Sequence, residues 1–125
     1  LMYPDKQVLA VCGDGGFMMN SQELETAVRF QLNLIVIIFN DASYGMIKWK
    51  QKAQELEDFA LDFNNPDFVK YAESYGANGH RISSNEQFVV IMENAFSQGG
   101  VHVIDLPIDY SQNTKTLLED LKQFD

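Results

Sequence analysis

The fold is decided by two stretches, QVLAVCGDGG at residues 7–16 and LIVIIFNDAS at residues 34–43. Each begins with a short apolar run and ends in a polar or glycine-rich turn, which is the pattern of a buried strand followed by a sharp change of direction. The run at 34–39 has no polar alternation, as is typical of a strand that is covered on both faces in a parallel sheet. We therefore predict two buried strands, each followed by a turn.

The remaining sequence alternates helical and strand patterns. Apolar residues at helical spacing predict helices over about 21–31, 44–57, 66–75, 85–98 and 117–124, and apolar runs predict strands at 80–82 and 101–106. This alternation predicts an α/β fold, a doubly wound and mainly parallel sheet with helices on both faces. In such a sheet ligands bind at the carboxyl ends of the strands, where the turns at 13–16 and 40–43 are expected to lie.

Capping residues predict where several helices begin and end. Gly76 and the pair Gly99-Gly100 are expected to stop two helices. The predicted starts are a capping box of Asn20 with Glu23, a cap at Asn65 before Pro66, and a capping box of Ser84 with Gln87.

Composition and charge exclude several classes of protein. The chain has 125 residues, 46% of them hydrophobic and 22% charged, which is ordinary for a globular domain and excludes wholesale disorder. Its formal charge of −9 disfavours binding to a phosphate backbone, so no nucleic-acid partner is expected. The longest apolar run has six residues, whereas a membrane-spanning helix needs about 20, so no membrane partner is expected.

The ends and the cysteine content give further expectations. The start LMYPDKQV has neither a basic beginning nor a long apolar stretch, so no signal peptide is predicted. The first residue is not Met and the chain starts just before a strand, so we expect a piece of a larger protein. Cys12 is the only cysteine, which excludes an internal disulfide and is in keeping with a reducing, cytoplasmic location.

Asp14 and Asp41 are the candidate metal ligands. They are 27 residues apart, the length of one strand–helix–strand unit, so both carboxylates project at one edge if the two strands are neighbours. Two carboxylates and a turn carbonyl are hard oxygen ligands that suit Mg²⁺ or Ca²⁺. Gly15 and Gly16 leave backbone N–H groups open toward an anion such as a diphosphate. On spacing alone, ordinary turn or cap residues are the more common interpretation of both aspartates.

The motif in these turns resembles the signature of thiamine-diphosphate-dependent enzymes. In that family a GDG turn is followed some 25–30 residues on by a pair like Asn40-Asp41. The segments NDASYGMIKWKQ, DFVKYAESYGANGHRI and VHVIDLPIDYSQN are similar to those of acetolactate synthases, either the catabolic, FAD-independent type or the large subunits. The resemblance implies that residues 1–125 are the C-terminal part of the diphosphate-binding domain, a partial thiamine-diphosphate-binding fold.

The resemblance also implies which residues bind thiamine diphosphate and Mg²⁺. The metal ligands would be Asp14, Asp41 and the backbone carbonyl of Ser43, with Asp41 departing from the commoner Asn. The implied cofactor-binding residues are Gly13, Asp14, Gly15, Gly16, Asp41, Ser43, Tyr44, Gly45 and Met46.

Ile47 bears on the type of reaction. It stands three residues after Tyr44, where the decarboxylating members of the family carry an acid that handles protons. An apolar residue there withholds a proton from the decarboxylated substrate and favours joining it to a second oxoacid. Without the resemblance, core packing explains Ile47 equally well.

The implied parent enzyme joins two pyruvates to give 2-acetolactate and CO₂, a step that leads to acetoin or to branched-chain amino acids. We expect it to be cytoplasmic and a homodimer or homotetramer. No glutamate that activates the cofactor can be assigned here, so the isolated chain is expected to be inactive. The alternatives are a fragment of pyruvate oxidase, glyoxylate carboligase or a 2-oxoacid decarboxylase, and a flavodoxin-like metal-binding regulatory domain.

Other chemistry-bearing residues are interpreted structurally. His80 and His102 are expected to be isolated structural histidines on strands, and Cys12 a buried, unreactive thiol. Asp105 is expected to cap a turn at the end of the last strand. Trp49 faces either a substrate channel or a surface.

Overall fold

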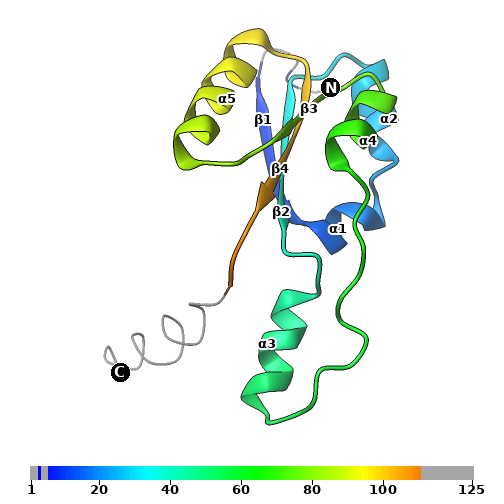
Figure 1. Ribbon diagram of the computed structural model, residues 1–125. Helices are drawn as coiled ribbons and strands as arrows, with labels where there is room; N and C mark the ends of the chain where they lie inside the picture. The colour runs from blue at the N-terminus through cyan, green and yellow to red at the C-terminus, as the bar shows by residue number, and fades with distance from the viewer. Residues whose placement is uncertain (1–2, 4–5, 111–125) are drawn as a thin grey trace.

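The computed structural model describes residue 3 and residues 6–110, and Figure 1 shows their arrangement. All strand pairs are parallel, and the order across the sheet is β1-β2-β4-β3. The strands are β1 (Val8–Gly13), β2 (Leu34–Asn40), β3 (Asn78–Arg81) and β4 (Val101–Pro107). The helices are α1 (Asp14–Met19), α2 (Glu23–Arg29), α3 (Gly45–Ala53), α4 (Phe68–Ser74) and α5 (Asn85–Gln98). The helix predicted at 117–124 lies outside the described residues.

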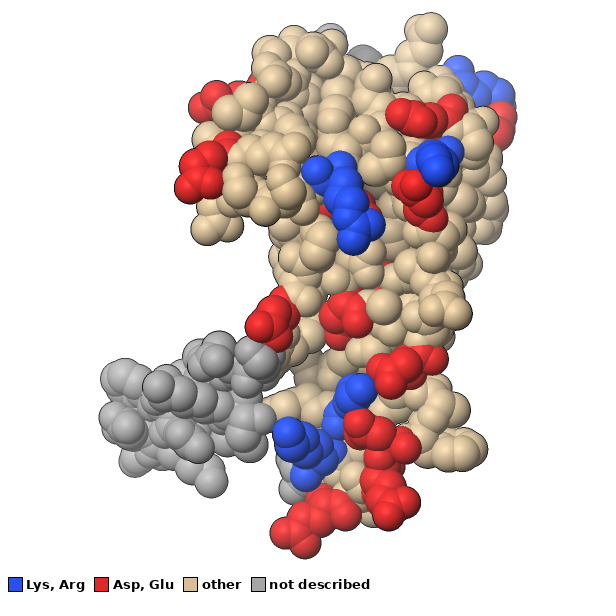
Figure 2. Space-filling view, in the orientation of Figure 1, with Lys and Arg blue, Asp and Glu red and all other residues tan. Residues whose placement is uncertain are grey.

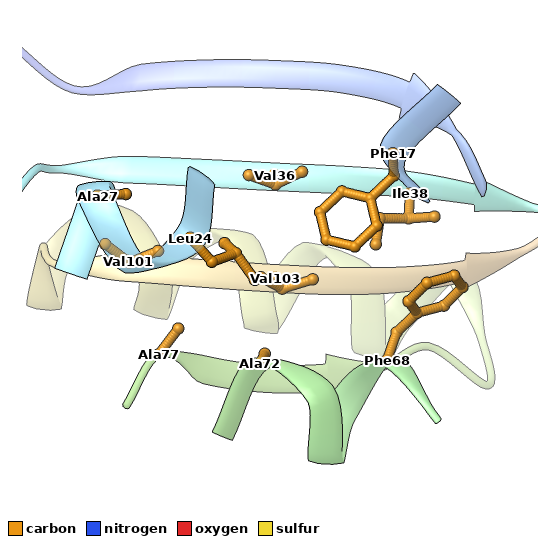
Figure 3. Close-up of a cluster of buried hydrophobic side chains, with 10 residues drawn as sticks. All are labelled: Phe17, Leu24, Ala27, Val36, Ile38, Phe68, Ala72, Ala77, Val101 and Val103. Atoms are coloured by element: carbon orange, nitrogen blue, oxygen red, sulfur yellow. The ribbon is translucent and has the colours of Figure 1, made fainter. Parts of the chain in front are cut away.

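Helices cover both faces of the sheet, which confirms the predicted α/β architecture. α1, α2 and α4 lie on one face and α5 on the other (Figure 1). The larger core lies under α1, α2 and α4, where Phe17 of α1 meets Phe68 of α4 edge to face with ring centroids 5.5 Å apart (Figure 3). Such an aromatic pair stabilises the fold by about 0.5–1.5 kcal/mol beyond its burial. The smaller core, under α5, is formed by Ile35, Ile37, Ile82, Ala95 and Ile104.

The register of β1 on β2 places the two predicted turns side by side. Gly13 pairs with Phe39, so Asp14, which follows β1, and Asn40, the last residue of β2, lie at the same edge. α3 and the loop after it lie beyond the carboxyl ends of the strands (Figure 1). The edge where ligands are expected is therefore enclosed by α1, α3 and this loop.

The first helical region differs from the prediction. Helix α1 begins at Asp14 itself, so Gly15 and Gly16 are helical and do not form an open turn. Burial of Phe17 against the sheet outweighs the poor helix propensity of the two glycines. Asn20 caps the carboxyl end of α1 and not the start of the next helix, which begins at Glu23.

The other helix ends give mixed outcomes. α3 stops at Ala53, earlier than predicted, and Glu55 just beyond it has a positive φ of 58°. The cap of α4 is Asp67, whose carboxylate accepts bonds from two backbone N–H groups, and not Asn65. The cap at Ser84 is confirmed, because its hydroxyl accepts a bond from Gln87 N at 3.2 Å. The stops at Gly76 and Gly99 are confirmed by positive φ values of 85° and 67°.

Candidate functional site

A cavity of about 220 Å³ opens at the carboxyl ends of β1 and β2. All ten residues that the sequence analysis assigned to the cofactor, the metal or the type of reaction line this cavity, and Phe39 and Tyr110 complete the lining. Those ten are Gly13, Asp14, Gly15, Gly16, Asp41, Ser43, Tyr44, Gly45, Met46 and Ile47. The fold therefore brings the two turns together, as the spacing predicted.

Asp14 is the buried centre of the site, with only 2% of its surface exposed. Its Oδ1 accepts a bond from Gly15 N at 2.8 Å, and its Oδ2 accepts bonds from Ala42 N at 2.8 Å and Asn65 Nδ2 at 2.6 Å. Within the described part of the chain no ion pair includes Asp14. Three N–H donors therefore stabilise this buried carboxylate without a cationic side chain.

The turn after β2 is held in an uncommon backbone conformation. Ala42 has a φ of 52°, in the left-handed region that residues with a side chain rarely adopt. Its N–H donates to Asp14, and its carbonyl accepts a bond from Phe63 N at 3.0 Å. Tyr44 N donates to the carbonyl of Leu61 at 2.9 Å. These bonds join the turn to the 61–63 segment, and neither of them uses the carbonyl of Ser43.

Two glycines permit close approaches inside the cavity. A Cβ on Gly45 would lie 2.3 Å from Oδ2 of Asp41, and a Cβ on Gly15 would lie 2.8 Å from the ring of Tyr44. Both distances are shorter than van der Waals contact. The same Asp41 oxygen accepts a bond from the Ser43 hydroxyl at 3.0 Å. The cavity therefore depends on the absence of a side chain at both positions.

The apolar part of the cavity comes from the first turn of α3. Met46 and Ile47 are 61% and 49% exposed, so neither is a core residue. Tyr110 also lines the cavity, and its partial burial and the charges of Asp41 and Asp14 raise the pKa of its hydroxyl.

A second cavity of about 430 Å³ adjoins the first and shares Asp41, Ser43, Gly45 and Tyr110 with it. Trp49 lines this second cavity, and its indole nitrogen is buried without a hydrogen-bond partner in the described structure. Lys48 also lines this second cavity, and its hydrogen bond to Asp62 raises the pKa of its ammonium group.

Three polar residues at this edge were not predicted to belong to the site. Asn65 donates both to Asp14 and to Oδ1 of Asn40, and Asn40 in turn donates to Asp105. Asp105 is 1% exposed and lies within β4, so it does not cap a turn. The signal for Asn65 was its position before proline, which equally suits a helix cap and was interpreted as one.

The histidines and the cysteine lie away from the cavity. His80 and His102 are not isolated, since their rings stack and His80 Nε2 lies 3.1 Å from His102 Nδ1. His102 is buried, and its Nε2 lies 2.9 Å from the carbonyl oxygen of Gly99, which confirms a structural role. Cys12 is only half-buried, and this burial, followed by the charge of Asp14, raises the pKa of its thiol.

The donor set at the cavity suits a hard cation. Among the described residues, no three His, Cys, Asp or Glu side chains form a metal-binding group. The available oxygens are those of Asp14 and Asp41, together with the Ser43 carbonyl, and such oxygens suit Mg²⁺.

On the face shown in Figure 2, basic side chains stand beside acidic ones and form no continuous basic patch. Over the described residues, no helix has the length and apolar character needed to cross a membrane.

The fold and the cavity define a cofactor-binding domain, and the comparison with protein families identifies its class. Residues 1–106 match the family described as thiamine pyrophosphate enzyme, C-terminal TPP binding domain. The chain belongs to this family.

Several similar proteins are named as acetolactate synthases, and a pyruvate oxidase is also among the similar proteins. The chain is 40% identical over 125 residues to an acetolactate synthase of Bacillus subtilis, covering 99% of the chain and 22% of that protein. It is 36% identical over 113 residues to a catabolic acetolactate synthase of Raoultella terrigena, covering 90% of the chain and 20% of that protein. The chain thus spans about a fifth of the length of these relatives.

A solved structure agrees with the fold. A thiamine-diphosphate-dependent 4-hydroxybenzoylformate decarboxylase of Rhodococcus jostii superposes with a TM-score of 0.77 and 29% identity, covering 86% of this chain and 21% of that one.

Proposed function

We propose that this chain anchors Mg²⁺ and the diphosphate of thiamine diphosphate through Asp14, Asp41 and the Ser43 carbonyl. The observation that carries the proposal is the carboxylate of Asp14, which is buried, accepts three N–H bonds and has no cationic side chain in the described ion pairs. A divalent cation between Asp14 and Asp41 compensates both charges. It also gives a diphosphate a positive partner in a protein whose formal charge is −9.

The proposed role of the chain is binding and orientation. Gly13, Gly15 and Gly16 form a wall without side chains, which leaves space for the diphosphate. Tyr44 also lines the cavity and packs on Phe63 with ring centroids 4.9 Å apart. Thiamine diphosphate, when bound, supplies the carbanion chemistry. We assign no general acid or base to this chain.

We propose an acetolactate synthase as the whole protein. Two pyruvates and one proton would give 2-acetolactate and CO₂, in a cytoplasmic homodimer or homotetramer that serves acetoin or branched-chain amino acid synthesis. The names of the similar proteins support this choice. Ile47 supports it further, because it presents an apolar side chain and no proton donor to the cavity.

A decarboxylase is the second candidate, because the structural neighbour in Rhodococcus jostii is named as one. The two functions differ in the fate of the decarboxylated substrate, which is protonated in one case and joined to a second oxoacid in the other. Product analysis of the full-length enzyme with pyruvate distinguishes acetolactate from acetaldehyde. Acetaldehyde as the main product would reject the synthase assignment.

Binding measurements test the anchor itself. In the full-length enzyme, Asp14→Ala and Asp41→Ala should each weaken Mg²⁺-dependent binding of thiamine diphosphate. Glu57→Ala, an exposed acidic position outside the cavity, serves as the control and should leave the affinity unchanged. Equal affinities for Asp14→Ala and Glu57→Ala, measured by calorimetric titration at fixed Mg²⁺, would refute the anchor.

The isolated 125-residue chain should not turn over pyruvate, because no activating glutamate is assigned in it. A colour assay for acetoin, after acid decarboxylation of any acetolactate, measures this. Sustained product from the pure chain would contradict the proposal that it is only one part of the catalytic unit.

A further inference from the structure

Four side chains lead by hydrogen bonds across the edge of the sheet to Asp14. Arg81 Nη1 donates to Asp105 Oδ2 at 2.9 Å, and Asn40 Nδ2 donates to Asp105 Oδ1 at 2.8 Å. Asn65 Nδ2 donates to Asn40 Oδ1 at 2.9 Å and to Asp14 Oδ2 at 2.6 Å. Because Asp105 lies on β4 and Asp14 begins α1, this relay joins two buried carboxylates from distant parts of the chain.

The two carboxylates at its ends, Asp105 and Asp14, set the direction of every bond in the relay. An ionised carboxylate only accepts hydrogen bonds, so Asn40 must turn its NH₂ group toward Asp105 and its oxygen toward Asn65. Asn65 must then present its own NH₂ group to that oxygen. The same nitrogen faces Asp14, which therefore receives a donor.

The amide of Asn65 keeps this orientation although its oxygen gains nothing from it. Oδ1 of Asn65 is buried and has no hydrogen-bond partner in the described part of the structure. Turning the amide over would place Oδ1 against the oxygens of Asp14 and Asn40, so the two acceptors hold the nitrogen in place. The contacts with Asp14 and Asn40 therefore fix the orientation of the Asn65 amide, although its oxygen makes no hydrogen bond among the described residues.

We propose that Asp105 positions the carboxylate of Asp14 for the divalent cation, acting through Asn40 and Asn65. Arg81 supports this by holding the second oxygen of Asp105. Neither Asp105 nor Arg81 lines the cavity, so both are positioning residues. The inference rests on the proposed Mg²⁺ site, and it adds that the hydrogen-bond polarity of the relay sets the geometry of that site.

Asp105→Asn tests the polarity because it changes no volume. Arg81 needs an acceptor, so the new amide oxygen faces Arg81 and the new NH₂ group faces Asn40. Asn40 must then reverse, and Asn65 meets a donor at Asn40 and an acceptor at Asp14, which its single NH₂ group cannot satisfy together. We expect Mg²⁺ affinity, titrated calorimetrically in the full-length enzyme with thiamine diphosphate held constant, to fall about 10–100-fold, as when other outer partners of metal ligands are changed.

A swap of the two residues separates polarity from simple damage to the fold. In the double variant Asp105→Asn/Asn40→Asp, the new carboxylate at position 40 accepts from the amide at position 105 and from Asn65. Asn65 then keeps its NH₂ group toward Asp14. We expect this swap to recover most of the Mg²⁺ affinity that Asp105→Asn loses, whereas a merely structural loss would persist.

Cutting the relay gives an independent measurement. Asn65→Ala removes the relay donor that contacts Asp14, on a segment without regular structure, so it should lower Mg²⁺ affinity. Adding Asp105→Asn to this variant should not change the affinity further. Tyr71→Phe is the matched control, because it removes a partly buried hydrogen bond, Tyr71 to Ser21 at 2.8 Å, outside the relay. Its Mg²⁺ affinity should equal that of the wild type.

The outcomes separate this inference from the proposed function. If Asp14→Ala weakens Mg²⁺ binding but Asp105→Asn does not, the metal site stands and the relay is overturned. If Asp105→Asn weakens binding and the swap does not recover it, the polarity argument is overturned. If Asp14→Ala has no effect, the proposed function itself fails.

Discussion

Replacing Gly45 by alanine tests the geometry of the proposed metal site with a single methyl group. That methyl would lie 2.3 Å from Oδ2 of Asp41, and ordinary contact begins near 3.4 Å, so the carboxylate must move by about 1 Å. Rotation is hindered, because the same oxygen is bonded to the Ser43 hydroxyl and the ring of Tyr110 lies only 3.2 Å from the new methyl group. Mg²⁺ holds its oxygen ligands at about 2.0–2.1 Å, so a shift of this size removes a ligand.

We expect Gly45→Ala to weaken Mg²⁺-dependent binding of thiamine diphosphate by about 10–100-fold, the range found for disturbed metal-ligand surroundings. Without Mg²⁺, the free energy of unfolding should not fall by a comparable amount. Gly45 is the first residue of α3, and alanine is favoured over glycine in helices by up to about 1 kcal/mol. Calorimetric titration of the full-length enzyme gives the affinity, and urea unfolding gives the stability.

A double-variant cycle decides whether the effect passes through Asp41. In an Asp41→Ala background the carboxylate is gone, so adding Gly45→Ala should change the affinity little. If Gly45→Ala weakens binding equally in both backgrounds, the methyl group acts elsewhere and the reasoning is refuted. Unchanged affinity in the wild-type background would refute it as well.

Three further predictions concern reaction choice, pH and packing. Ile47→Glu in the full-length enzyme should raise acetaldehyde relative to acetolactate, because it places a proton donor at the cavity; an active variant with an unchanged product ratio would return Ile47 to a passive wall. Burial, and then the neighbouring His102, lower the pKa of His80, so the folded chain takes up this proton less readily than the unfolded chain. The contribution of His80 to stability is therefore present above its ordinary pKa of about 6.5 and is lost as the pH falls through the lower folded value. His80→Gln should reduce the slope of the unfolding free energy between about pH 7.5 and 5.5, and equal slopes for both proteins would contradict this. Gly79→Ala should destabilise the chain by about 1–3 kcal/mol in urea unfolding, because its Cβ would lie 2.5 Å from the carbonyl oxygen of Val69, and an unchanged midpoint would argue against this rigid contact.

The sequence predicted the parts of the fold that depend on local pattern. The apolar runs and the glycine-rich turn located β1 and β2, and their spacing predicted that Asp14 and Asp41 meet at one edge. Both predictions hold because strand burial and the βαβ connection leave few alternatives for stretches of this length. The Ser84 cap was equally predictable, since its partner Gln87 lies three residues away.

The relay was not predictable, because each of its members has a more common local role. Asn65 before a proline suggests a helix cap, and Asp105 before Leu106-Pro107 suggests a turn. Their actual partners are 51 and 65 residues away in sequence, at Asp14 and Asn40. Only the pairing of β4 with β2, and the course of the segment around Asn65 past Asp14, reveal these contacts.

The left-handed conformation of Ala42 has a consequence for how the site is prepared for its ligand. For a residue with a side chain this conformation is unfavourable by roughly 1–2 kcal/mol. The bonds to Asp14 and from Phe63 hold it, so the entropy loss of ordering the turn occurs during folding and not during binding. A preorganised turn of this kind binds its ligand more tightly than a flexible one with the same contacts. Cofactor affinity would thus depend on the main chain at Phe63, a residue outside the motif, and few side-chain changes at that position would alter this bond.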